Sequence, residues 1–320
     1  MKRQLLGVAA ILLSISTYAQ DNPLWMRYCA ISPDGTTIAF TYKGDIYTVP
    51  STGGRASQIT TNPAHDTKPI WSPDGKKIAF ASDRMGSMDI FEVNKEGGIP
   101  KRLTTHSGNE TPVAYKDAGH ILFLANIMPT AEDAQFPSGQ FQQVYEVNTE
   151  GGRPILFSSM PMEDISINHT GNTLLYHDKK GYEDPWRKHH TSSITRDIWL
   201  CSLNGNRTFR KQTAFNGEDR TPVWASDDKS FYYLSEEKGS FNIFKRDIDG
   251  NTSKQITNHT KHPVRFLSAA SNGTLCYGYD GEIYTVKEGA IPQKVQISIV
   301  TDKNDKDLIR QIKRSGATEI

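Results

Sequence analysis

The stretch IWSPDGKKIAFASDRMGSMDIFEVNKEGGIPKRLT (residues 70–104) predicts one complete four-stranded unit. Its first two strands are joined by Ser72-Pro73-Asp74-Gly75, and Asp-Gly between apolar runs favours a hairpin because both residues tolerate the positive φ of tight turns. A second strand ends at Phe80, a third begins at Asp89, and a Gly97-Gly98 turn leads to the last. Four short strands in about 40 residues, joined by tight turns, are typical of one blade of a β-propeller.

Two series of aromatic residues repeat this unit along the chain. The first series ends the second strand of each unit, at Phe40, Phe80, Phe123, Tyr176, Tyr233 and Tyr277. The second series lies in the third strand, at Tyr47, Phe91, Tyr145, Trp199, Phe244 and Tyr284. The two series interleave throughout, and a single blade cannot bury its own faces. The sequence therefore predicts an all-β, six-bladed propeller with four antiparallel strands per blade.

The phase of the repeats also predicts how the ring closes. Each blade begins with its innermost strand and ends with its outermost one, and the blades span roughly 25–60, 65–104, 109–157, 162–213, 219–257 and 262–297. No strand is lent from one end of the chain to complete a blade at the other. We therefore expect closure without strand exchange, by side-chain packing alone between the first and last blades.

The first 19 residues have the pattern of a secretory signal peptide. Lys2 and Arg3 precede an apolar run from Leu5 to Ile15 that is too short to span a bilayer, and a cleavage site with small residues follows at 17–19. We expect residues 1–19 to be removed and the mature protein not to insert in a membrane. The predicted propeller then occupies residues 20–297 of an exported protein, periplasmic or extracellular.

Composition excludes some classes of partner. The formal net charge is +1 and the mean hydropathy is −0.55, which predicts neither a nucleic-acid-binding field nor a membrane-binding surface. Cys29, Cys201 and Cys276 lack CxxC spacing, and we expect Cys201 and Cys276 to be small buried core residues. An odd cysteine count in an exported protein leaves a free thiol or an unassigned pairing. No cofactor is expected.

The distance between the two aromatic series shows where blades are enlarged. It is short in four blades but extends from Phe123 to Tyr145 in blade three and from Tyr176 to Trp199 in blade four. Insertions in a repeat array map to loops on one face, commonly the binding face. We therefore expect the loops at 126–142 and 178–196 to lie side by side, on the face opposite the Ser-Pro-Asp-Gly turns.

The second of these loops gathers aromatic, cationic and imidazole side chains: Trp186, Arg187, Lys188, His189 and His190. One interpretation is a solvated loop in which the Trp fills a gap. Another is a contact surface for a partner domain or peptide, anchored by the Trp, with the Arg and Lys binding carboxylates. A third is a metal site that also uses His177, although no further ligand has the spacing to complete a tetrahedral shell.

Polar segments between blades carry further histidines, among them His65 and His262. These segments lead into the innermost strands, so they are expected to surround the mouth of the central channel. They are interpreted either as solvated linkers or as a rim that binds a substrate or an ion. The sequence has no Gly-x-Ser-x-Gly elbow, no His-Glu-x-x-His and no glycine-rich phosphate cradle, so we assign no catalytic residue.

The Ser-Pro-Asp-Gly-x-x-Ile-Ala-Phe pattern, followed by Ser-Asp-Arg and Asp-Ile-Phe, resembles the TolB-type propeller repeat. That repeat occurs in TolB, in prolyl oligopeptidase-like enzymes and in tricorn-type proteases, so it indicates fold rather than activity. The stretch 180–186, leading to Arg196-Asp197-Ile198-Trp199, resembles the insertion in the N-terminal six-bladed propeller of tricorn proteases. The predicted signal peptide leads directly into blade one, without the small α/β domain that precedes the propeller of TolB.

In tricorn proteases a second propeller, a PDZ domain and a serine-protease core follow the first propeller. Residues 315–320 resemble residues 26–31, where blade one begins, so we interpret 298–320 as a C-terminal extension that starts a further domain absent from this sequence. The Ser-His catalytic machinery of the family therefore maps to no residue here. The family's basic pair, which anchors the peptide C-terminus on the loop entering blade three, has no counterpart in 106–111.

Three functions follow as hypotheses. The first is the non-catalytic propeller of an exported tricorn-like serine protease, which gates or guides peptides through its channel and docks a protease or PDZ-type domain. The second is a TolB-like envelope propeller that binds proteins. The third is a propeller enzyme resembling oligogalacturonate lyase, which would need a metal-binding histidine cluster in the channel.

Overall fold

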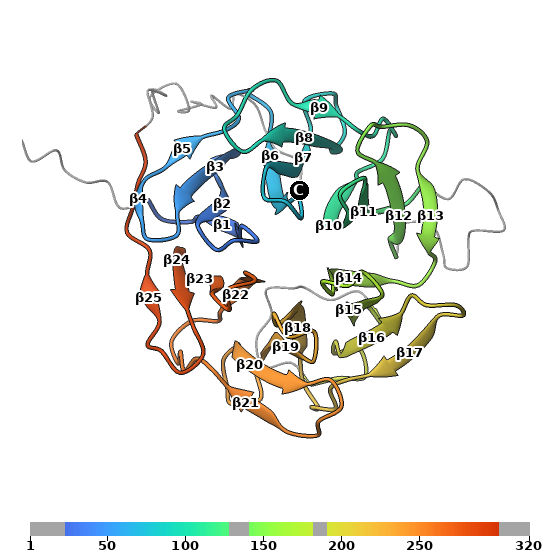
Figure 1. Ribbon diagram of the computed structural model, residues 1–320, viewed down its shortest axis with the longest axis vertical. Coiled ribbons are helices and arrows are strands. Elements are labelled where there is room, and N and C mark those ends of the chain that lie inside the picture. Colours follow the sequence, from blue (N-terminus) through green and yellow to red (C-terminus); the bar gives the residue numbers. More distant parts are fainter. Residues whose placement is uncertain (1–22, 128–140, 182–190, 301–320) are drawn as a thin grey trace, which may run out of the picture.

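The computed structural model describes residues 23–127, 141–181 and 191–300, where all regular elements are β-strands. Six four-stranded antiparallel sheets surround a central axis (Figure 1), and the strands of each sheet are consecutive or nearly so in the chain. The prediction of an all-β, six-bladed propeller with four antiparallel strands per blade is confirmed. Among the residues that the structure describes, no strand from one end of the chain completes a four-stranded blade at the other end, so the predicted lack of strand exchange is confirmed as well.

The blades follow each other around the ring in chain order. Blade one contains β1 (Arg27–Ile31), β2 (Thr37–Tyr42), β3 (Asp45–Pro50) and β5 (Ser57–Gln58), and blade two contains β6 (Asp66–Trp71), β7 (Lys77–Ser82), β8 (Asp89–Asn94) and β9 (Lys101–Arg102). Blade three contains β10 (Thr111–Asp117), β11 (His120–Ala125), β12 (Gln143–Asn148) and β13 (Ile155–Ser158), and blade four contains β14 (Met162–Ile167), β15 (Thr173–Asp178), β16 (Ile198–Ser202) and β17 (Thr208–Lys211). Blade five contains β18 (Asp219–Trp224), β19 (Ser230–Ser235), β20 (Asn242–Asp247) and β21 (Ser253–Gln255), and blade six contains β22 (Arg265–Ala269), β23 (Leu275–Tyr279), β24 (Glu282–Val286) and β25 (Gln293–Lys294).

The two aromatic series are direct cross-strand partners. Phe40 pairs with Tyr47 between β2 and β3, with ring centroids 5.8 Å apart. The same register recurs in the other five blades, as Phe80–Phe91, Phe123–Tyr145, Tyr176–Trp199, Tyr233–Phe244 and Tyr277–Tyr284. Aromatic cross-strand pairs stabilise a sheet because they bury large areas at little conformational cost. Each blade therefore has a similar aromatic pair in its middle strands.

A threonine after the outermost strand ties that strand to its blade. The hydroxyl of Thr60 accepts a hydrogen bond of 2.9 Å from the backbone N–H of Ile46, just inside β3. Thr104, Thr213 and Thr257 accept the equivalent bond in blades two, four and five. The threonine of the repeated Gln-Ile-Thr pattern thus satisfies a buried backbone donor that would otherwise lack a partner.

The two faces of the disc carry different connections. We call the face with the connections between blades, and between second and third strands, the rim face. Those two kinds of connection touch: Asp66 donates its N–H to the carbonyl of Gly44 at 2.8 Å, and Val264 does so to Phe241 at 3.0 Å. The opposite, turn face carries the Ser-Pro-Asp-Gly turns, where Gly35 adopts a φ of 76°. The strand ends flanking 128–140 and 182–190 therefore lie on the rim face, in neighbouring blades three and four.

The ring is closed by more than side chains. After blade six, β26 (Ile297–Ser298) pairs in parallel with β4 (Gly54–Arg55) on the outer part of blade one. Gly54 donates its N–H to the carbonyl of Gln296 at 2.8 Å, and Ala56 donates to that of Ser298 at 2.9 Å. The expectation that side-chain packing alone joins the first and last blades is thus wrong, because a segment outside the six blades adds backbone bonds. We call this junction of blades one and six the seam.

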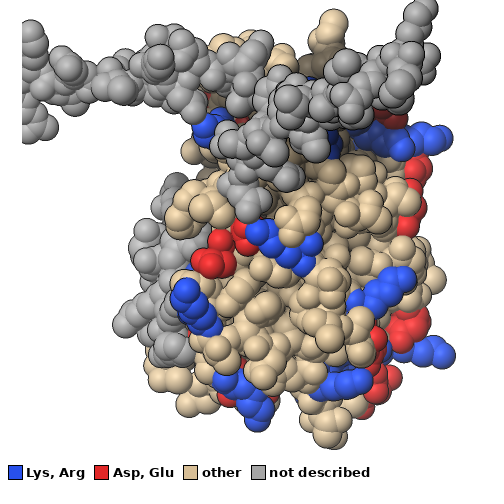
Figure 2. All heavy atoms as spheres, turned by 90° about the vertical axis from the view of Figure 1, so that its left-hand side faces the viewer, with Lys and Arg blue, Asp and Glu red and all other residues tan. Residues whose placement is uncertain are grey.

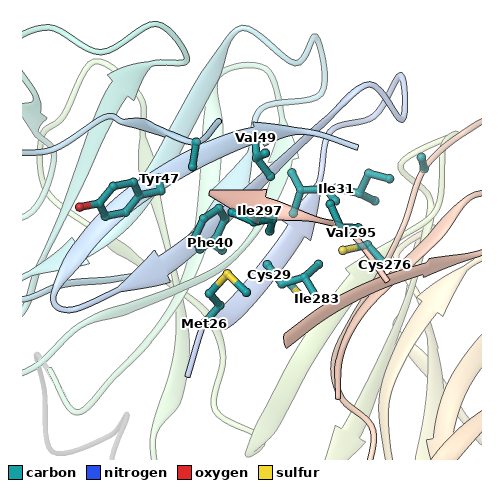
Figure 3. Close-up of a cluster of buried hydrophobic side chains, with 13 residues drawn as sticks. Met26, Cys29, Ile31, Phe40, Tyr47, Val49, Cys276, Ile283, Val295 and Ile297 are labelled. Carbon is teal, nitrogen blue, oxygen red and sulfur yellow. The ribbon is translucent and has the colours of Figure 1, made fainter. Parts of the chain in front are cut away.

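Buried apolar side chains from both blades also meet at the seam. Figure 3 shows Met26, Cys29, Ile31 and Phe40 of blade one beside Cys276 and Ile283 of blade six, with Val295 and Ile297 from the segment that follows. Each is at most 4% exposed. This cluster provides the apolar burial that holds the two ends of the ring together.

The outer surface is of mixed charge. Figure 2 shows the side of the disc near β4 and β25, where Lys and Arg side chains are interspersed with Asp and Glu. In the part of the chain that the structure describes, no helix has the length and apolar character needed to cross a bilayer.

Candidate functional site

A cavity of about 510 Å³ lies on the propeller axis and is lined by residues from all six innermost strands. These strands, β1, β6, β10, β14, β18 and β22, run from the rim face towards the turn face and surround the centre of Figure 1. Small-molecule and peptide sites prefer concave places of this size with a few convergent polar groups. The cavity is therefore the candidate functional site.

An irregularity in each innermost strand shapes the cavity wall. The pairing of β1 with β2 shifts between Arg27 and Ala30, and the other five innermost strands have a shift at the equivalent place. The residues at this position form what we call the bulge ring: Tyr28, Lys68, Pro112, Asp164, Thr221 and Phe266. All except Pro112 have positive φ, between 49° and 57°. Such backbone is costly for a residue with a side chain and tends to be kept where function requires it.

The bulge ring has two chemically different halves. On one side the rings of Tyr28 and Phe266 lie 4.7 Å apart, and Lys68 Nζ lies 5.8 Å from the Tyr28 ring centroid. On the other side the hydroxyl of Thr221 donates a hydrogen bond of 2.7 Å to Asp164 Oδ2. Burial raises the pKa of Tyr28, Arg27 lowers it, and the negative charge of Asp164 raises it again. The cavity thus offers a cation beside aromatic rings and a carboxylate on the facing half.

Beside Asp164, Glu163 lies close to three basic side chains. Its carboxylate lies 3.2 Å from His177 Nε2, 2.8 Å from Lys179 Nζ and 3.6 Å from Arg196 Nε. Burial alone would raise the pKa of Glu163, but the bonds and charges of His177 and Lys179 outweigh burial and hold that pKa well below its ordinary value. Glu163 is therefore a fixed negative charge in the cavity wall.

A second buried carboxylate continues this network towards blade five. Glu218, only 1% exposed, lies 3.4 Å from Arg196 Nη1 and accepts a bond of 2.7 Å from Arg220 Nε. Arg196 lies two residues before β16, at the end of the enlarged connection of blade four, so the network joins that connection to the cavity. Paired buried charges of this kind fix the geometry of the groups they contain.

The hydroxyl and the imidazole in this network do not face each other as a nucleophile and its base would. Thr221 donates its hydroxyl proton to Asp164, and the ring nitrogen His177 Nδ1 accepts the backbone N–H of Thr221 at 3.3 Å. The imidazole thus faces a backbone amide instead of the hydroxyl that it would need to activate. Fixed charges and hydrogen-bonding groups in the wall can orient a charged, extended ligand.

The sequence-predicted histidines lie away from the cavity and from each other. His65 is exposed between blades one and two, where its backbone N–H donates a 2.7 Å bond to Asp83 Oδ1. His262 lies between blades five and six, with Nε2 3.3 Å from Asp280. Neither lines the cavity. The predicted contact residues Trp186, Arg187, Lys188, His189 and His190 lie outside the described residues.

The suggested metal ligand His177 lies in β15 and is 4% exposed. It lines the cavity, but its two ring nitrogens face Glu163 and Asp164 and the amide of Thr221. The other histidines named for that site, His189 and His190, are not described. Within 23–127, 141–181 and 191–300, no three His, Cys, Asp or Glu side chains group in a way that suits a metal ion.

Sequence reasoning missed the bulge ring and the carboxylates Glu163 and Glu218. Aligning the blades on their innermost strands would have revealed the ring, because its members occupy one repeat position while varying from Lys to Asp to Phe. Variation at a fixed repeat position that faces a cavity is the pattern expected of a wall adapted to a ligand. The two carboxylates had no comparable signal, because all of their basic partners except Arg220 lie in or beyond a neighbouring strand, or in a neighbouring blade.

Known proteins with this architecture were compared with the chain. A family profile described as the tricorn protease N-terminal β-propeller domain matches residues 23–290. Tricorn protease homolog 1 of Streptomyces coelicolor is 25% identical over 281 residues, which cover 87% of this chain and 25% of the relative. The tricorn protease homolog of Saccharolobus solfataricus is 27% identical over 295 residues, which cover 88% of this chain and 26% of the relative.

Solved structures agree in fold. A crystal structure of the tricorn protease matches with a TM-score of 0.72 at 20% identity, covering 88% of this chain and 27% of that one. TolB from Acinetobacter baumannii matches with a TM-score of 0.60 at 14% identity, covering 82% of this chain and 61% of that one. The chain spans about a quarter of the length of the two tricorn protease homologs described above.

Proposed function

The chain belongs to the family of tricorn protease N-terminal β-propeller domains, and on that premise we propose that it is the non-catalytic propeller of an exported, tricorn-like serine protease. In this role the propeller guides peptides through its central channel and docks other domains of the protease on its rim face. The observation that carries the proposal is the cavity on the axis, whose wall presents a cation and a carboxylate on different sides.

Peptides suit such a wall because they carry a charge at each end. Lys68 beside Tyr28 offers a site for a terminal carboxylate, and Asp164 with Glu163 offers one for a terminal amine or a basic side chain. The family's basic pair on the loop entering blade three is absent from 106–111, so Lys68 takes over the role of binding the carboxylate. A hydrogen bond to a charged group contributes about 1.5–3 kcal/mol.

The binding test uses the full chain and a fluorescein-labelled pentapeptide, with either a free or an amidated C-terminus. The free peptide should bind more tightly, and Lys68→Ala should weaken its binding by roughly tenfold while leaving the amidated peptide unaffected. Lys76→Ala, an exposed lysine next to a turn-face hairpin, is the matched control and should change nothing. Equal binding of both peptides to the unchanged chain and to Lys68→Ala would contradict the proposal.

Apolar side chains on the rim face support docking there. Leu24, Trp25 and Met85 are 51%, 71% and 60% exposed, and all belong to segments of that face. Trp25 is held in place by blade six, because Gly281 packs so closely that a Cβ there would lie 3.0 Å from the Trp25 nitrogen. Ile99, Ile155 and Ile291 are also exposed but stand singly, one per blade, near outer-edge turns, which is normal for a surface.

Domain organisation and export have tests of their own. The reading frame that continues past Ile320 should encode a second propeller, a PDZ domain and a serine-protease core. If neither this reading frame nor a neighbouring gene encodes these domains, the protease assignment is contradicted. The isolated chain should hydrolyse no peptide, and N-terminal sequencing of secreted protein should begin near Gln20. Measurable peptide hydrolysis by the isolated chain would contradict the non-catalytic role. A cytoplasmic protein that still carries residues 1–19 would contradict export.

A further inference from the structure

Two of the three cysteines, Cys29 and Cys276, lie at the seam. They occupy two repeat positions that meet between neighbouring blades. In each blade the second strand contains an apolar triplet that ends with its aromatic residue, such as Ile38-Ala39-Phe40, and the middle residue of the triplet pairs with the innermost strand. The residue just before that partner in the innermost strand defines one repeat position: Cys29, Pro69, Val113, Ile165, Pro222 and Leu267. The triplet residues are Ala39, Ala79, Leu122, Leu175, Tyr232 and Cys276.

These two positions meet across the interfaces between blades. Ile165 of blade four packs in one cluster with Leu122 of blade three, and Leu267 of blade six packs in one cluster with Tyr232 of blade five. At the seam, the equivalent pair is Cys29 of blade one and Cys276 of blade six. The repeat therefore places apolar or small residues at the other interfaces and a pair of thiols where the two ends of the ring meet.

The two cysteines are buried neighbours. Cys276 is fully buried and Cys29 is 4% exposed, and the Cys29 thiol lies 3.4 Å from the carbonyl oxygen of Phe266 in blade six. Both belong to the apolar cluster at the seam (Figure 3). The Ser268 hydroxyl lies 3.5 Å from the carbonyl oxygen of Cys29 and 3.4 Å from that of Cys276, so one small side chain bridges the two backbones. A disulfide requires neighbouring backbones with side chains that point towards each other.

We propose that Cys29 and Cys276 form a disulfide bond that joins blade one to blade six and closes the propeller covalently. Two S–H bonds break and one Sγ–Sγ bond forms. The two electrons and two protons pass to an oxidant of the disulfide class, either glutathione disulfide or a disulfide oxidoreductase, which is released as two thiols. Oxidising compartments outside the cytoplasm maintain such oxidants.

Burial determines when this bond forms and how long it persists. Burial, together with the neighbouring Cys29 thiol, raises the pKa of Cys276 well above its ordinary value, and thiolates rather than thiols carry out the exchange. Exchange in the closed ring is therefore slow. The bond forms while the last blade is still docking, and it then resists reduction because reductants cannot reach it. The bond is a permanent closure of an exported chain rather than a reversible switch.

The experiment counts thiols and maps the bond in the full chain, oxidised with glutathione disulfide during refolding. Cys201, buried in blade four, serves as the internal reference. Titration with Ellman's reagent in guanidinium should find one free thiol where the reduced chain shows all three. Trypsin without reductant should release residues 28–43 linked to residues 266–287, with Cys201 in the separate peptide 197–207.

Thermal unfolding gives a second readout. Reduction in guanidinium, followed by refolding with the thiols kept reduced, should give a chain whose Tm is roughly 10 °C below that of the oxidised chain, because the bond closes a loop that includes almost the whole propeller. The variant C29S/C276S should show no difference between oxidised and reduced samples, whereas C201S should keep the full difference. Three free thiols after oxidation, a link that involves Cys201, or an unchanged Tm on reduction would each overturn the proposal.

Discussion

The indole of Trp71 donates a hydrogen bond of 2.9 Å to the carbonyl oxygen of Ala30, across the interface between blades two and one. Both residues lie in innermost strands, so the bond ties neighbouring blades together next to the cavity. The same bond recurs between Trp224 and Ser166, at 3.0 Å, across the interface of blades five and four. Trp71 and Trp224 are 9% and 6% exposed. Tryptophan at this position thus links adjacent blades through a backbone acceptor.

Trp71→Phe should lower the free energy of unfolding by about 1–3 kcal/mol, because it keeps a large aromatic ring but leaves a partly buried carbonyl without its donor. Chemical denaturation followed by circular dichroism measures the change. Trp25→Phe, at a 71% exposed site, is the matched control and should stay within about 0.5 kcal/mol of the unchanged chain. Equal effects of the two substitutions would show that the hydrogen bond of Trp71 contributes nothing.

Ile297→Ala tests the backbone closure at the seam. Ile297 is 2% exposed and lies in β26, so its truncation should leave a cavity and lower the free energy of unfolding by about 2–5 kcal/mol. Ile291, 80% exposed a few residues earlier, provides the control Ile291→Ala, which should have almost no effect. If both variants unfold at the same denaturant concentration as the unchanged chain, β26 does not hold the ring closed.

Stability should fall as pH rises through neutrality, because two buried carboxyls are held protonated. Burial raises the pKa of Glu110 to about 7, against a smaller lowering by the nearby Thr104 side chain, and burial also raises that of Asp219 to about 7. The folded state therefore binds protons that the unfolded chain has already lost above pH ~4.5. Each group should add a slope of up to about 1.4 kcal/mol per pH unit, with stability lost between pH ~5 and ~7.

Glu110→Gln should remove one of these two contributions and reduce the slope. Urea unfolding at a series of pH values measures it, and Glu96→Gln, at an exposed turn, should leave the slope as it is. A slope that Glu110→Gln does not alter would show that Glu110 does not titrate in this range.

Glu163→Gln should act in the opposite pH range. Its lowered pKa contributes stability that is present above the ordinary glutamate pKa and is lost as pH falls through the folded-state value. The substitution should therefore destabilise the chain by about 3–5 kcal/mol at pH 7, because it removes the negative partner of buried positive groups, and by much less at pH 3. The control is Glu150→Gln, which breaks an exposed Glu–Lys pair of 2.7 Å and should leave the unfolding midpoint unchanged.

Trp25→Ala tests the docking surface on the rim face. The side chain is 71% exposed, so the isolated chain should unfold at nearly the same temperature. Binding to the protease part, expressed separately and measured by calorimetry, should weaken at least tenfold if Trp25 is an anchor of the interface. Ile99→Ala, at a 98% exposed outer-edge site, should leave that binding unaltered.

The sequence predicted what is local and repeated. Phe40 and Tyr47 belong to series of fixed phase, and each series pairs within one hairpin, so spacing alone was enough to place them. The same holds for Thr60, whose partner lies in the adjacent strand. Local contacts of this kind recur with the period of the repeat, and a period can be counted in a single sequence.

The parts that were missed depend on contacts between distant segments. Ile297 pairs beside Gly54 through a two-residue strand with no copy in another blade, so no period revealed it. Glu163 was not noticed because its partner Lys179 lies beyond a neighbouring strand and Arg196 beyond the enlarged connection. The positive φ of Tyr28 and Lys68 likewise arises from packing around the axis, which overrides the local preference of Tyr and Lys.

The parallel pair of β26 and β4 also determines how the molecule responds to traction. A force applied to the chain at residue 300 is transmitted through the Gly54–Gln296 and Ala56–Ser298 bonds before it reaches the strands of blade six. These bonds lie across the direction of the pull and must shear together, so blades one and six share the load. A domain attached at residue 300 therefore transmits mechanical load to the perimeter of the disc and not to the residues that line its axial passage.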